Sequence, residues 1–155
     1  GGPKIDKVAR EGDKNAIEFK RVYLKDGSYD FSFSGLKTQV LNYINSERQA
    51  GREINVPDLA ASFQESIMEV IADKAINAAT SYGNNKIVVA GGVAANNRLR
   101  ELLASKGEAA GIEILKPAQI LCTDNGAMIA CSAYYKMKKG EFADMSLDAC
   151  PGLEF

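Results

Sequence analysis

The sequence predicts an α/β fold, because helical and strand patterns alternate along it. The apolar run 87–90 has no polar alternation, which is typical of a strand covered on both faces of its sheet. Gly91 and Gly92 follow at once and allow a sharp turn, and a helix is expected to begin near Ala95. A second run, 112–115, predicts another short strand.

Helical spacing of apolar residues predicts three helices before this turn. Pro3 and Gly12 bracket a short one. Ser34 is a candidate N-cap for a second helix, whose apolar positions include Leu36, Val40 and Ile44. Pro57 opens a long third helix that is expected to end near Gly83, with these apolar residues on about one face: Leu59, Phe63, Ile67, Val70, Ile71 and Ile76.

The remaining segments are predicted from shorter patterns. Residues 17–24 are too charged for a central strand and predict an edge strand or an extended loop. Residues 29–33 alternate aromatic and polar side chains, as a half-buried strand does. Thr123 or Asp124 is expected to cap a last helix that continues to about Met137.

Composition restricts the class of protein. The 155 residues include 19 basic and 20 acidic ones, a balance that gives no electrostatic footprint for nucleic acid or a membrane surface. With no repeat or linker, we expect one domain over residues 1–155. Three cysteines without a C-x-x-C pair fit free thiols in a reducing cytoplasm. There is no histidine, which removes the commonest general base and metal ligand.

The paired glycines Gly91 and Gly92 predict a binding site for an anionic group. The carboxyl end of a buried strand is where α/β sheets bind ligands, and the next helix would point its free N–H groups there. The pattern matches neither G-x-G-x-x-G nor a Walker A loop. A tight connection without a ligand remains an alternative. Asn96 could bind a ribose or base edge, or satisfy local backbone.

Acidic residues give weaker signals. Asp124 fits an N-cap carboxylate better than a metal ligand, because a lone carboxylate without a histidine partner is a weak metal signal. Glu65, Glu69 and Asp73 follow one another at helical spacing and predict a solvated face.

Four stretches together resemble the universal family of tRNA adenosine threonylcarbamoyltransferases, once labelled O-sialoglycoprotein endopeptidases. They occur in the family's order and span nearly the whole chain; they are Gly1–Pro3, Phe31–Thr38, Gly91–Asn96 and Cys122–Ala130. Ala94 departs from the family pattern, in which serine is common. The resemblance implies a partial lobe of the actin-like, Hsp70-like (ribonuclease H-like) ATPase fold, helix-rich with a small mixed sheet.

The resemblance also implies an activity and its site. Family members transfer a threonylcarbamoyl group from threonylcarbamoyl-adenylate to an adenosine of tRNA. Gly2 and Asn96 match positions that contact the adenylate or ATP, and Gly91 and Gly92 are assigned to the same site more loosely. Asp124 matches a ligand of the catalytic metal, iron or zinc.

Other parts of the family's site have no counterpart in the sequence. The two metal-binding histidines of an H-x-x-x-H motif and a glycine-rich phosphate hairpin are missing. We therefore expect a C-terminal lobe fragment of a longer two-lobed protein, inactive alone, with no catalytic residue of its own. In the cytoplasm the longer protein would meet tRNA and partner subunits and no membrane, and the fragment is expected to self-associate through exposed strand edges.

Two rival functions remain open. One is half of a carbohydrate or acyl kinase of the same actin-like superfamily, which would also place a glycine pair beside adenosine. The other is a non-catalytic lobe that docks to partners through an exposed face of Leu36, Val40 and Ile44.

Overall fold

The computed structural model describes residues 1–24, 27–148, 150 and 152. It divides the chain into two compact units, Gly1–Cys122 and Thr123–Phe155. The prediction of one domain over residues 1–155 stays a prediction. The fold class is α/β, as expected, and helices dominate it.

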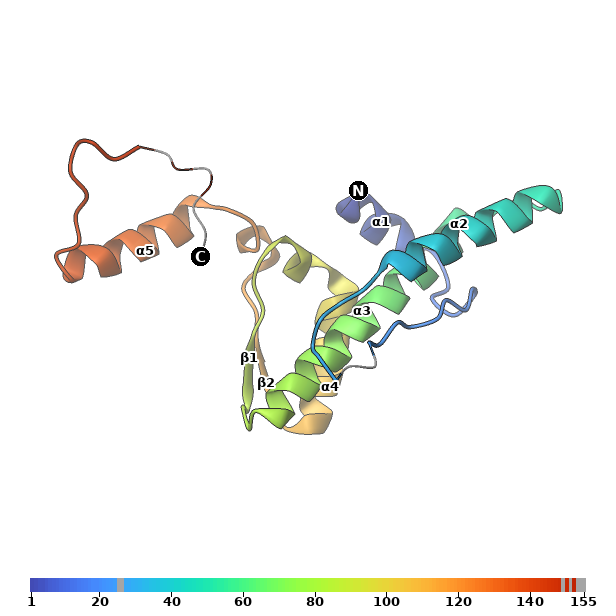
Figure 1. Cartoon of the computed structure of the whole chain (residues 1–155), viewed down its shortest axis with the longest axis horizontal. Coiled ribbons are helices and arrows are strands. Elements are labelled where there is room, and N and C mark those ends of the chain that lie inside the picture. Colours follow the sequence, from blue (N-terminus) through green and yellow to red (C-terminus); the bar gives the residue numbers. More distant parts are fainter. Residues whose placement is uncertain (25–26, 149, 151, 153–155) are drawn as a thin grey trace. The chain divides into compact units, whose positions relative to one another are not determined.

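Helix α3 (Val56–Ser81) is the longest element and the centre of the first unit (Figure 1). Asn55 caps it by accepting a hydrogen bond from the Asp58 N–H, and Pro57 occupies its first turn, as predicted. It packs against α1 (Gly2–Ala9) and α4 (Asn97–Ala110). One core cluster joins Ala72 of α3 to three leucines of α4, which are Leu99, Leu102 and Leu103.

The sheet holds two short strands that flank α4 in the chain. β1 (Lys86–Val88) and β2 (Glu113–Leu115) pair in parallel, so among the described residues the sheet is parallel rather than mixed. Ile87 and Ile114 pack toward the helices, whereas Val88 is 75% exposed. The prediction that helices cover both faces is therefore wrong for the described residues: α3 and α4 cover one face only.

Between α1 and α2 (Ser34–Gln49), the described residues 10–24 and 27–33 form no strand. Residues 17–24 run along α3: the Ile17 N–H donates to Ser62 and the Arg21 guanidinium to Glu69. Residues 29–33 are not the predicted half-buried strand. Lys74 of α3 donates to the carbonyls of Ser28 and Asp30. In a sheet these carbonyls would accept hydrogen bonds from a neighbouring strand, but here a lysine side chain takes that place.

Helix α2 corrects two further predictions. Its N-cap position is Phe33, without a side-chain hydrogen bond, and Ser34 is already the first helical residue. Leu36, expected on an exposed docking face, is 2% exposed, whereas Val40 and Ile44 are half-buried.

The second unit contains α5 (Gly126–Lys138), and the described residues after α5 form no helix or strand. Asn125, rather than Thr123 or Asp124, caps this helix by accepting a hydrogen bond from the Met128 N–H. None of the α5 residues is buried.

None of the helices within the described residues has the length and apolar character required to cross a bilayer.

Candidate functional site

The glycine turn after β1 has the expected sharp geometry. Gly91 has φ 85°, in the left-handed region that favours glycine, and both glycines are exposed. A short 3₁₀ helix, η1 (Gly92–Ala95), follows, so α4 begins at Asn97 rather than near Ala95. Asn96 therefore lies at the junction between the turn and the first helical residue of α4.

The side chain of Asn96 is held on both of its polar ends. Its Oδ1 accepts from the Leu99 N–H at 3.0 Å, which caps α4. Its Nδ2 donates to Asp6 Oδ1 at 3.1 Å and to Gln64 Oε1 at 2.8 Å. One asparagine thus ties α1, α3 and α4 together beside the glycine turn.

The neighbouring Asn97 repeats this arrangement. Its Nδ2 donates to Asp6 Oδ2 at 3.4 Å, and its Oδ1 accepts from Gln119 Nε2. Gln119 begins the 3₁₀ helix η2 (Gln119–Leu121) and donates also to the Ala95 carbonyl. Asp6 consequently receives amide donors from two adjacent asparagines and a guanidinium from Arg10 at 2.8 Å.

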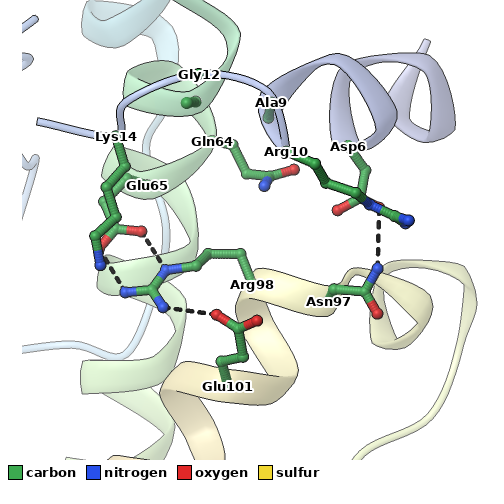
Figure 2. A pocket seen from close by; sticks show the side chains of 11 residues that line it. Asp6, Ala9, Arg10, Gly12, Lys14, Gln64, Glu65, Asn97, Arg98 and Glu101 are labelled. Atoms are coloured by element: carbon green, nitrogen blue, oxygen red, sulfur yellow. Dashed lines mark hydrogen bonds and ion pairs between the residues drawn. The ribbon is translucent and has the colours of Figure 1, made fainter. Parts of the chain in front are cut away.

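A cavity of about 230 Å³ opens beside these amides, between α1, α3 and α4 (Figure 2). Its polar lining consists mostly of charged groups, and Figure 2 shows the Gln64 side chain reaching between Glu65 and Arg98 on one side and Asp6 and Asn97 on the other. Three acidic and three basic residues line it, namely Asp6, Glu65, Glu101, Arg10, Lys14 and Arg98.

Glu65 is the most buried charge of this lining, at 6% exposed. Burial raises the pKa of its carboxyl, but hydrogen bonds from Arg98 and the positive charges of Arg98 and Lys14 outweigh burial and hold the pKa below its ordinary value. Arg98 bonds it through Nε at 2.5 Å and Nη2 at 2.8 Å, a bidentate pair.

The prediction of a solvated acidic face on α3 is therefore wrong. Glu69 pairs with Arg21 at 2.7 Å, and Asp73 pairs with Lys106 at 2.6 Å and accepts from the Tyr23 hydroxyl. These carboxylates bind side chains from the segment 17–24 and from α4, so they hold both against α3 and are not left to solvent.

The structure gathers some of the predicted site residues and leaves one apart. Gly2 is exposed and begins α1, whose Asp6 bonds Asn96, while Gly91 and Gly92 lead into Asn96 along the chain. Asp124 belongs to the second unit, where it is exposed and directly precedes the capping Asn125. The described residues contain no group of three side chains able to hold a metal ion.

Sequence reasoning missed Asp6 and Gln64, the two partners of Asn96 Nδ2. Nothing in their local pattern marks them, because each is one polar residue on an amphipathic helix. One signal was available for Gln64: it follows Phe63, a predicted core position of α3. A polar side chain that is buried requires a hydrogen-bond partner, so a partner elsewhere in the chain could have been expected.

Three curated proteins cover nearly the whole chain, and a family model matches residues 1–131 under the description "tRNA N6-adenosine threonylcarbamoyltransferase". The proteins carry that same name. The one from Moorella thermoacetica is 52% identical over 99% of this chain and 45% of its own length. Those from Clostridioides difficile and Clostridium perfringens are 51% and 50% identical, over 99% of this chain and 46% and 45% of their own lengths. The chain therefore spans about half the length of these relatives.

Proposed function

Since the chain belongs to the family of tRNA N6-adenosine threonylcarbamoyltransferases, we propose that it forms one wall of the nucleotide site in such an enzyme. The enzyme would move threonylcarbamoyl from threonylcarbamoyl-AMP to an adenosine of tRNA. The observation that carries the proposal is the fixed amide of Asn96, which lies between an exposed glycine turn and a polar cavity.

Each predicted residue has a role that its geometry supports. Gly91 offers a backbone that a ligand can approach closely, because nothing lies within 4 Å of where a side chain would begin. Gly2 gives the same open approach from α1. Gly92 continues the turn, and Asn96 positions it against α1 and α3. ATP or threonylcarbamoyl-AMP is the nucleotide that we assign to this wall.

Asp124 is proposed as one ligand of a divalent metal, iron or zinc. Its exposed carboxylate can supply one oxygen ligand to either metal, and further ligands would have to come from other parts of a longer protein. When bound, such a metal would polarise the carbamoyl carbonyl or orient phosphate. Asp124 would hold it from the residue just before the α5 cap.

The chain alone is proposed to be inactive. It supplies nucleotide contacts and one carboxylate, but the sequence contains no histidine to complete a metal site or act as a base. The longer protein would act on tRNA with partner subunits in the cytoplasm, a location that the three free cysteines support. Isolated, the chain is expected to self-associate through the exposed edges of the two strands.

A titration of the ¹⁵N-labelled chain with AMP, followed by NMR, tests the nucleotide wall. We expect chemical-shift changes at Gly2, Gly91, Gly92 and Asn96 at millimolar AMP, because a single wall binds weakly. Asn96→Ala should abolish them, whereas Asn45→Ala on the exposed surface of α2 should not. If the signals of these four residues do not change even at about 10 mM AMP, the proposal is contradicted.

A further inference from the structure

The start of α5 carries a pair of residues that can react with each other. Asn125 is followed by Gly126, and this is the one Asn-Gly pair in the sequence. The backbone nitrogen of the residue after an asparagine can attack the side-chain amide carbon. Glycine permits the attack because it has no side chain to obstruct the approach. The pair makes Asn125 a candidate for spontaneous deamidation.

The reaction needs only water in addition to the chain. A bond forms between the Gly126 nitrogen and Asn125 Cγ, the Cγ–Nδ2 bond breaks, and ammonia leaves with the proton of the Gly126 N–H. Water then opens the resulting succinimide ring at either of its two carbonyls. One product is aspartate, and the other is isoaspartate, in which the backbone runs through the former side chain.

In the folded helix, the contacts of Asn125 oppose this reaction. Its Oδ1 accepts from the Met128 N–H at 3.0 Å, and its Nδ2 donates to the Thr123 carbonyl at 2.8 Å. The backbone of Asn125 is extended, with ψ 155°, whereas ring closure requires the Gly126 nitrogen to eclipse the Cα–Cβ bond. The cap of α5 therefore holds the two reacting groups apart.

The helix that keeps this cap in place is itself exposed. None of the α5 residues is buried, and nothing lies within 4 Å of where a side chain of Gly126 would begin. A helix of 13 residues with no buried residue is marginally stable, so its first turn opens by local unfolding. Each opening releases the Asn125 side chain and lets its backbone rotate.

We propose that Asn125 is a self-modification site and that α5 controls its deamidation. While the cap is formed the residue persists as asparagine, and when the first turn opens it converts irreversibly to aspartate or isoaspartate. Either product places a second carboxylate directly after Asp124, and isoaspartate also adds one carbon to the backbone where α5 begins. The conversion requires no nucleotide, metal or RNA, so it is independent of the proposed function.

The rate of deamidation in the whole chain tests the site. The chain is incubated at neutral pH and digested. Mass spectrometry then follows the gain of one mass unit at each asparagine, and chromatography separates aspartate from isoaspartate peptides. We expect Asn125 to convert faster than Asn45, which is exposed and followed by serine. Gly126→Ala should suppress the conversion, because the alanine side chain obstructs the attacking nitrogen.

Two comparisons test the control by α5. A synthetic peptide of residues 119–131 is too short for a stable helix, and its Asn125 should convert roughly 5-fold faster than that of the chain, the factor that an N-cap contributes. Ala130→Gly, on an exposed residue one turn into α5, keeps the Asn-Gly pair. It should speed conversion about 2- to 5-fold, because glycine weakens the helix. Ala104→Gly, the same change on the exposed surface of α4, should leave the rate at Asn125 unchanged.

Two results would overturn the inference. If Asn125 in the unaltered chain converts no faster than Asn45, it is not a modification site. If either the peptide or Ala130→Gly converts at the rate of the unaltered chain, α5 does not control the reaction. Neither result bears on the nucleotide wall, which the AMP titration tests separately.

Discussion

Among single residues, Glu65 connects three parts of the first unit: α3, α4 and the segment after α1. Its carboxylate meets Arg98 of α4 and, at 3.8 Å, Lys14 from the segment after α1. A buried carboxylate of this kind is stabilising only while it is ionised and paired, because a protonated one leaves Arg98 with a weaker partner. The first unit should consequently lose stability in acid through this residue.

Glu65→Gln tests that link. The depressed pKa means that the contribution of Glu65 is fully present above the ordinary value of 4.5 and is lost as pH falls through the lower folded value. We expect the variant to be about 1.5–3 kcal/mol less stable at pH 7. This difference should shrink below pH 4.5 in urea unfolding curves. Glu53→Gln, on an exposed residue, is the control, and two parallel pH curves for Glu65→Gln and the unaltered chain would contradict the prediction.

At the scale of elements, an asparagine caps three of the helices. Asn55, Asn96 and Asn125 each accept a hydrogen bond from the N–H three residues later, at the starts of α3, α4 and α5. The nitrogen of Asn96 also bonds Asp6 and Gln64, which lie on two other helices, whereas the nitrogen of Asn125 donates to the nearby Thr123 carbonyl. Asn55 thus isolates the value of capping alone.

Asn55→Ala should destabilise the first unit by about 1 kcal/mol, because the Asp58 N–H loses its acceptor at the start of α3. Asn55→Asp keeps an acceptor and should cost less than half as much. Thermal unfolding followed by circular dichroism measures both. If alanine and aspartate give equal losses, the cap hydrogen bond contributes nothing.

Sequence patterns predicted elements well where periodicity was long. α3 has 26 residues with a repeating apolar face, and Pro57 and Gly83 correctly indicated where it begins and ends. The segment 29–33 failed because alternation alone does not supply a neighbouring strand, and the buried Lys74 meets its acceptors instead. Caps were misplaced by one or two residues, since serine, threonine, aspartate and asparagine all fit the local pattern.

The candidate site was only half predictable for a related reason. Gly91, Gly92 and Asn96 are consecutive or nearly so, and a short motif can identify them. Asp6 and Gln64 lie 90 and 32 residues from Asn96 along the chain, so only the folded packing of α1 and α3 brings them to it. Long-range hydrogen bonds of this kind leave no local signature.

For the molecule as a whole, burial differs sharply between two helices of nearly equal length. α4 has 14 residues and buries Leu99, Leu102, Leu103 and Gly107, whereas α5 has 13 residues and buries none. An isolated helix of this length is only marginally stable in water. Tertiary packing therefore decides how well its amides are protected from hydrogen exchange.

Amide hydrogen exchange should therefore separate them. We expect amides in the middle of α5 to exchange on the order of 100-fold faster than those of α4, because α5 opens locally while α4 opens with the core. Both helices carry an asparagine cap, so capping cancels in the comparison. Equal protection in the two helices would show that α5 packs against a surface in solution.

The parallel pairing of β1 with β2 has a consequence for the order of folding. Lys86 reaches its partner Glu113 only after the whole of α4 has been traversed, so the sheet has to close a long loop before any strand contact forms. α4 has its own cap at Asn96 and a left-handed terminus at Gly111, and can form from local contacts. Weakening α4 should slow folding, whereas weakening the three-residue strands should mainly speed unfolding.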